Sequence, residues 1–152
     1  MRHIKTIGPR QLYLAISILF LLSGLVACSD KALQTTAKAS RDIAAGNIAL
    51  QNTIIQAQSA GTLTADQIRP IVQVTLTVGQ AGKQLDAAIL GITQLSPADK
   101  TKILAILQPV VAAVADGIAA TNLITNQTIK TEVMAALTTI NAALATARGV
   151  LG

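Results

Sequence analysis

Cys28 is the only cysteine in the chain, and its position indicates most clearly which chemistry this sequence could support. A cysteine can act as a nucleophile, bind a metal ion or carry a covalent modification. An intramolecular disulfide is impossible because there is no second cysteine. Cys28 directly follows the small residue Ala27, at the end of an apolar segment. An ordinary buried thiol is the alternative to a modified one, and this position favours modification.

The acidic residues that follow Ala27 are scattered singly, and no two have a spacing that would pair them on one helix face for acid–base catalysis. They are Asp30, Asp42, Asp66, Asp86, Asp99, Asp116 and Glu132. Histidine, the most frequent general base and a frequent zinc ligand, occurs only as His3. No serine lies in a Gly-x-Ser-x-Gly or Ser-x-x-Lys motif. We therefore expect no catalytic residue, no metal site and no bound cofactor, and hence a protein that is not an enzyme.

The first 27 residues have the composition of an export signal. Arg2, Lys5 and Arg10 give a positively charged start without an acidic residue, and an apolar run of eleven residues follows from Leu12 to Leu22. Small and apolar residues then lead to Cys28. These are the three parts of a secretory signal peptide. The apolar run is also shorter than the roughly 20 residues that a membrane-spanning helix needs.

The residues Leu25, Val26, Ala27 and Cys28 resemble the lipobox of bacterial lipoproteins. The resemblance implies that residues 1–27 are removed, that Cys28 is diacylated, and that its new amino group is acylated. The expected partner is therefore membrane lipid, bound through a covalent acyl group. In similar lipoproteins of two-membrane bacteria, an Asp after the Cys retains the protein at the inner membrane. Ser29 stands there instead, so the expected location is the cell envelope, with the outer membrane favoured.

The chain that remains after residue 27 is nearly neutral and lacks aromatic residues. Residues 28–152 hold nine Lys and Arg against seven Asp and Glu, so the high net charge of the whole chain comes largely from the signal. A nucleic-acid partner, which needs a dense basic surface, is therefore not expected. Alanine accounts for 25 of these 125 residues, and no His, Trp, Tyr or Phe is among them. The core must consist of Ile, Leu, Val and Ala.

Apolar residues recur at alternating spacings of three and four in four segments, which is the helical period. The segments are 40–57, 68–92, 103–124 and 129–150, joined by short gaps. The first runs through Ser40, Ile43, Asn47, Leu50, Ile54 and Ala57. The pattern predicts an all-α, up-down four-helix bundle formed by one domain, residues 31–152. Residues 28–30 would be the lipidated cysteine and its short tether.

Polar residues at the expected helix ends agree with this period. Thr64 stands three residues before Gln67, the spacing of a capping box. Ser96 precedes Pro97 and Asp99, which suits a helix start, and Asn126 or Thr128 can cap the last helix. Gly61 should end the first helix.

Several features leave alternatives open. Residues 72–78 alternate apolar and polar side chains as a strand does, although the helical spacing continues to residue 92. Residues 103–124 resemble a membrane span, but Asp116 costs roughly 2.5–3.5 kcal/mol in a membrane centre, so we favour a bundle helix that bends at Pro109. Gly79 and Gly82 favour a packing notch, with a functional helix contact or a hinge as the alternative. Asn47 falls on a core position, where it would set the pairing of helices.

The function expected from these features is that of a membrane-anchored envelope lipoprotein. We expect a non-enzymatic structural or adaptor module that acts by contact with an unknown envelope protein or with itself. One alternative is a carrier of an apolar ligand or lipid inside the aromatic-free bundle. A second alternative is a helical protein active at the membrane surface. A sizeable cavity would favour the carrier, whereas a filled core with an exposed apolar stripe would favour the adaptor.

Overall fold

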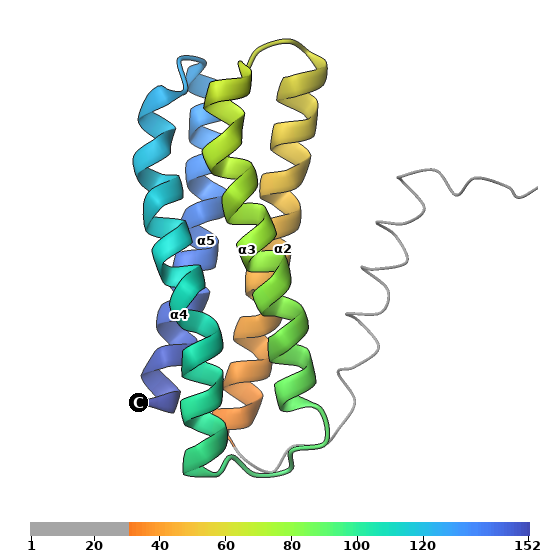
Figure 1. The fold of residues 1–152 in the computed structure, drawn as a ribbon, viewed down its shortest axis with the longest axis vertical. Coiled ribbons are helices and arrows are strands. Elements are labelled where there is room, and N and C mark those ends of the chain that lie inside the picture. Colours follow the sequence, from red (N-terminus) through yellow and green to blue (C-terminus); the bar gives the residue numbers. More distant parts are fainter. Residues whose placement is uncertain (1–30) are drawn as a thin grey trace, which may run out of the picture.

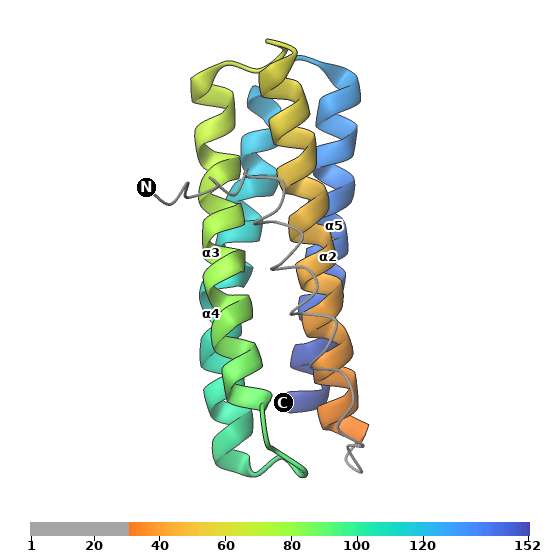
Figure 2. The same ribbon diagram turned by 90° about the vertical axis from the view of Figure 1, so that its right-hand side faces the viewer.

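The computed structural model describes residues 31–152, and these residues form a bundle of four helices. The helices are α2 (Lys31–Ser59), α3 (Ala65–Ile89), α4 (Pro97–Ala120) and α5 (Gln127–Leu151), with a 3₁₀ turn, η1 (Thr121–Leu123), after α4. They run alternately up and down (Figure 1). A second view shows α3 and α4 beside α2 and α5 (Figure 2). The predicted all-α, up-down four-helix bundle is confirmed, while the lipobox, Cys28 and Ser29 lie outside the described residues.

The core lies where the spacing of apolar residues placed it. All six predicted positions of the first segment, from Ser40 to Ala57, are buried in α2. The largest fully buried side chains are Leu33, Leu50, Ile71, Leu85, Ile103, Leu107, Leu137, Ile140, Leu144, Val74, Val78 and Val110. Each such side chain contributes roughly 1.5–3 kcal/mol by leaving water. The hydrophobic effect along these four stripes therefore supplies the main stabilisation of the bundle.

The helix ends use the residues that the sequence indicated. Thr64 and Gln67 form a complete capping box at the start of α3. Ser96 and Asp99 form another at the start of α4, and Asn126 caps α5 by accepting the N–H of Ile129. Gly61 and Gly91 follow α2 and α3 with positive φ angles of 65° and 80°, a conformation that glycine adopts without steric cost.

The first helix is longer than the prediction. α2 begins at Lys31, nine residues before Ser40, and buries Leu33 and Thr36 on the same stripe. The hydroxyl of Thr36 donates to the backbone oxygen of Ala32 at 2.8 Å, which allows this polar residue to occupy the core. The spacing of residues 33, 36 and 40 continues the period of three and four, so the sequence also contains the signal for a helix that starts before Ser40.

The strand-like segment 72–78 is helical, as the longer period predicted. Within α3, Val74 and Val78 are buried while Leu76 is 55% exposed. A strand would have put all three on one face, whereas the helix separates them by 200° for each step of two residues. Burial in this segment therefore follows the helical period.

α4 contains Pro109 and is one continuous helix on both sides of it.

Close helix contacts lie at Gly46 and Gly117, whereas Gly79, one of the two glycines predicted to form a packing notch, makes none. A Cβ atom built at Gly46 would lie 2.6 Å from Cγ1 of Ile140 in α5, and one at Gly117 would lie 2.7 Å from Cγ2 of Val74 in α3. At Gly79 the nearest atom would be Nδ2 of Asn47, at an ordinary 3.8 Å. The prediction of a packing notch at Gly79 is therefore wrong. Gly46 and Gly117 are the positions where a missing side chain lets two helices approach.

Candidate functional site

The chemically capable side chains of residues 31–152 do not converge on one place. Within this range no three His, Cys, Asp or Glu side chains are grouped so that they could hold a metal ion. Asp66, Asp116 and Glu132 are exposed on separate helices. Asp42 accepts a hydrogen bond from Nζ of Lys38 at 3.1 Å on the same helix. Each carboxylate thus has a local environment of its own.

Asp86 is the carboxylate whose surroundings are most unusual. It lies half-buried on α3, and the hydroxyl of the buried Ser40 on α2 donates to its Oδ1 at 3.5 Å. Burial raises the pKa of Asp86 above its ordinary value, and the hydrogen bond from Ser40 opposes that rise. Asp86 and Ser40 are 46 residues apart in the sequence, and only the pairing of α2 with α3 brings them together.

Replacing Asp86 with Asn should stabilise the protein at neutral pH. The raised pKa means that Asp86 favours folding below its unfolded pKa, and that this contribution is lost as pH rises through the folded value. The expected gain at pH 7 is below about 1 kcal/mol because the carboxylate is half exposed. Thermal unfolding of both proteins from pH 3 to pH 7 measures it. The difference should shrink toward acid pH, and a constant or reversed difference would contradict this account.

Asn47 is a buried polar residue with one unsatisfied atom. Its Nδ2 donates to the backbone oxygen of Thr75 on α3 at 3.3 Å, while its Oδ1 is buried and has no hydrogen-bond partner within the described residues. The oxygen of Thr75 also belongs to the hydrogen-bond ladder of α3. Asn47 therefore occupies the predicted core position and links α2 to α3 at one level of the bundle. Its buried Oδ1 loses the hydrogen bonds that it would make to water, which costs stability.

Asn47→Leu is expected to raise the free energy of unfolding by about 1 kcal/mol, because it removes a buried unsatisfied oxygen. The new side chain would lie beside Gly79, which leaves room at this point. Urea unfolding monitored by circular dichroism measures the change. Asn47→Ala serves as the control, since it removes the same oxygen but leaves a cavity and should not stabilise. A loss in the Leu variant would show that the hydrogen bond to Thr75 outweighs the unsatisfied oxygen.

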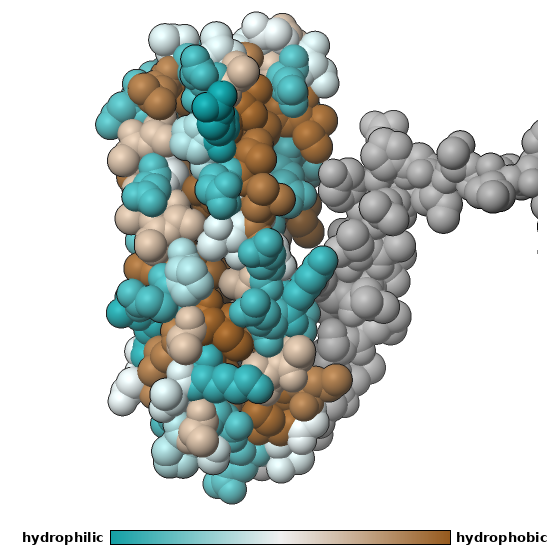
Figure 3. All heavy atoms as spheres, viewed as in Figure 1, coloured by the Kyte–Doolittle hydropathy of each residue, from teal (hydrophilic) through white to brown (hydrophobic). Residues whose placement is uncertain are grey.

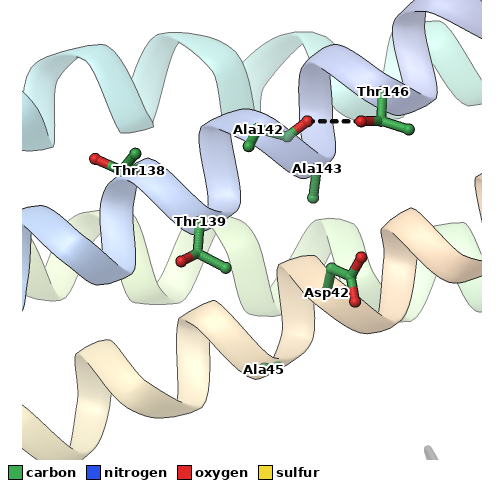
Figure 4. A pocket seen from close by; sticks show the side chains of 7 residues that line it. All are labelled: Asp42, Ala45, Thr138, Thr139, Ala142, Ala143 and Thr146. Atoms are coloured by element: carbon green, nitrogen blue, oxygen red, sulfur yellow. Dashed lines mark hydrogen bonds between the residues drawn. The ribbon is translucent and has the colours of Figure 1, made fainter.

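A shallow groove of about 410 Å³ runs on the surface between α2 and α5 (Figure 4). Its lining consists of Asp42, Ala45, Thr138, Thr139, Ala142, Ala143 and Thr146. The hydroxyls of Thr139 and Thr146 donate to backbone oxygens of their own helix at 3.0 Å. The groove is open, and its residues Asp42, Thr139 and Thr146 have partners within their own helices. A ligand site, by contrast, encloses its ligand and directs several polar groups at it. We attribute the groove to small side chains along this helix pair.

Three of the exposed large apolar residues lie on α2 and α3. Ile48 and Ile55 of α2 and Leu76 of α3 are 43%, 48% and 55% exposed, and we call these three residues the α2–α3 apolar face. Ile48 and Ile55 are two helical turns apart, and the Asn47–Thr75 hydrogen bond brings Ile48 and Leu76 to one level. Hydrophobic side chains gather on the upper part of these helices (Figure 3). Contiguous exposed apolar patches are frequent at contact surfaces.

Within residues 31–152, two helices are long and apolar enough to cross a membrane by length and composition alone. They are Pro97–Leu123 and Gln127–Leu151, of whose most apolar windows 33% and 39% are buried in the bundle. Both direct a buried stripe to the core shared with α2 and α3. Their composition is compatible with membrane contact, and their packing agrees with the prediction of bundle helices.

Comparison with known proteins identifies no relative of this chain. No protein-family model, no curated protein and no solved structure matches this chain.

Proposed function

We propose that this protein is a lipid-anchored module of the bacterial cell envelope that acts by protein contact. The observation that carries the proposal is the lipobox-like segment Leu25–Cys28, which is followed after only two residues by the helical bundle. Acylation of Cys28 would hold the bundle at a membrane surface, and Ser29 favours the outer membrane where there are two. The protein would then act where it is anchored, through the surface of its helices.

Two features of the bundle favour contact with a protein over transport of a ligand. The core is closely packed at Gly46 and Gly117, where a single added methyl group would overlap neighbouring side chains. The groove between α2 and α5 is open on the surface, so it does not enclose a ligand. The α2–α3 apolar face, by contrast, exposes three large side chains on helix segments 43–59 and 70–82, which carry no charged residue. This arrangement suits an adaptor.

Intact-mass analysis of the protein from its native membrane tests the anchor. The expected mass corresponds to a chain that begins at Cys28 and carries two or three acyl chains. A chain that retains residues 1–27, or a soluble one with an unmodified Cys28, contradicts the proposal. Digestion and lipid release then locate the acyl groups on the first residue.

Site-specific photo-crosslinking in intact cells tests the contact. A photoreactive amino acid at Leu76 or Ile48 should yield one discrete crosslinked protein, or a dimer of this chain. The same amino acid at Thr131, exposed on α5, is the matched control and should yield much less. If Thr131 yields as much crosslinked product as Leu76 or Ile48, the α2–α3 apolar face is not the contact surface. Stoichiometric lipid beyond the anchor in material purified without detergent exchange would support the carrier instead.

A further inference from the structure

The antiparallel arrangement gathers most of the basic side chains at one end of the bundle. The starts of α2 and α4 and the ends of α3 and α5 meet there (Figure 1), and we call residues 31–42, 83–102 and 148–152 the basic end. Its charged residues are Lys31, Lys38, Arg41, Lys83, Lys100, Lys102 and Arg148 against Asp42, Asp86 and Asp99. Seven cations against three carboxylates give a side-chain charge of +4. The far end, residues 55–70 and 116–132, has two cations against three carboxylates, a charge of −1.

The carboxylates of the basic end are held against the protein, whereas most of its cations project into solvent. Asp42 pairs with Lys38, Asp86 is half-buried beside Ser40, and Asp99 accepts the backbone N–H of Ser96. Six of the seven cations are exposed and the seventh, Lys100, is partly so. A surface that approaches this end therefore meets mainly positive charge.

An apolar side chain also projects from the basic end. Leu90, in the connection from α3 to α4, is 75% exposed and is the most exposed large apolar residue among those described. Basic residues around an exposed Leu are the combination by which proteins bind the interfacial region of a membrane. Leu123 is 55% exposed in η1 at the far end, but the charge there is negative.

We propose that the basic end binds the anionic headgroups of the phospholipid membrane that holds Cys28, with Leu90 entering the interface. The proposal rests on the proposed lipid anchor, because the anchor sets the distance. Only Ser29 and Asp30 separate Cys28 from Lys31, so three consecutive Cα–Cα steps keep the Cα atom of Lys31 within about 11 Å of that of Cys28. This short tether allows the basic end to approach the headgroups to within the Debye length of about 8 Å at physiological salt, where exposed charges still interact.

This contact would orient the bundle on the membrane. Each basic residue near an anionic surface strengthens binding by about fivefold, so the seven together exceed the opposition of Asp30 and of the three carboxylates of the basic end. The basic end would face the lipid and the far end would point away from it. Ile55 and the upper part of the α2–α3 apolar face would then be presented at a distance from the membrane, where a protein partner can reach them.

Lysine labelling of the full lipidated protein in vesicles tests this orientation. The protein is reconstituted in phosphatidylcholine alone or with 30% phosphatidylglycerol, treated with a membrane-impermeant amine-acylating reagent, and read by mass spectrometry. In the anionic vesicles, labelling of Lys83, Lys100 and Lys102 should fall at least threefold, and 0.5 M NaCl should restore it. Lys130, at the far end, is the internal control and should not change. If the labelling of Lys83, Lys100 and Lys102, like that of Lys130, is the same in neutral and anionic vesicles, the proposal is overturned.

Charge-reversed variants separate this contact from the anchor. The triple variant Lys83→Glu, Lys100→Glu, Lys102→Glu should lose the response to phosphatidylglycerol, whereas Arg69→Glu with Lys130→Glu at the far end should keep it. Helix content by circular dichroism verifies that each variant folds. If the intact mass shows an unmodified Cys28, the proposed lipid anchor is refuted, but the proposal about the basic end is not yet decided. Salt-sensitive sedimentation of that protein with phosphatidylglycerol vesicles still decides about the basic end, and absence of sedimentation would refute it.

Discussion

Ile140→Ala is expected to lower the free energy of unfolding by about 2–5 kcal/mol, a large part of the roughly 5–15 kcal/mol that holds a domain folded. Ile140 is fully buried on α5, and its Cγ1 lies where a side chain at Gly46 of α2 would be. Truncation removes apolar contacts and leaves a cavity between the two helices. Urea unfolding followed by circular dichroism at 222 nm measures the loss.

Gly46→Ala should also destabilise, by about 1–3 kcal/mol, because its methyl group overlaps Ile140 and approaches the backbone oxygen of Ala136 to 3.3 Å. Gly149→Ala is the matched control. Nothing lies within 4 Å of its added methyl group, so alanine's higher helix propensity should stabilise it by up to about 1 kcal/mol. The double variant Gly46→Ala, Ile140→Ala should lose less than the two single losses together. Strict additivity would mean that these residues do not touch.

Cys28→Ser is expected to abolish stable attachment to the membrane. The thiolate of Cys28 is the nucleophile that would accept a diacylglyceryl group, and a serine hydroxyl, with its far higher pKa, cannot replace it. Each buried methylene contributes about 0.8 kcal/mol to membrane binding, so two or three acyl chains hold a protein where one chain dissociates. Membrane fractionation and intact mass should show an uncut precursor or a released protein. Full retention of a processed variant in the membrane would contradict the lipid anchor.

Ser29→Asp provides the matched control for this experiment. It leaves Cys28 in place, so processing and acylation should remain. If the organism has two membranes, the variant should shift from the outer to the inner membrane on density-gradient separation. An unchanged distribution would show that Ser29 does not direct the protein to the outer membrane.

The helices and their core were predictable because they depend on local rules. A helix buries one stripe, so the spacing of Ile43, Leu50 and Ile54 indicates which side chains face inward before any partner helix is known. The same holds for the caps at Thr64 and Ser96, whose hydrogen bonds join residues three apart. The lipobox interpretation of Cys28 is equally local, and it stays a prediction because that residue lies outside the described range.

Long-range pairing decided the rest. Nothing near Gly46 in the sequence shows that Ile140 lies opposite, so spacing favoured Gly79 while packing selected Gly46 and Gly117. The partner of Asp86 is Ser40, 46 residues away, and its raised pKa follows from that pairing.

The charge distribution also depends on the tertiary structure and not on the sequence alone. Residues 28–152 are nearly neutral when counted along the chain, and only the alternation of four antiparallel helices separates a basic end from an acidic one. Periodicity determines which face of a helix is buried, because that depends on the helix alone. The rotation, level and direction of its neighbours depend on all four helices together, so only the tertiary structure decides which side chains meet.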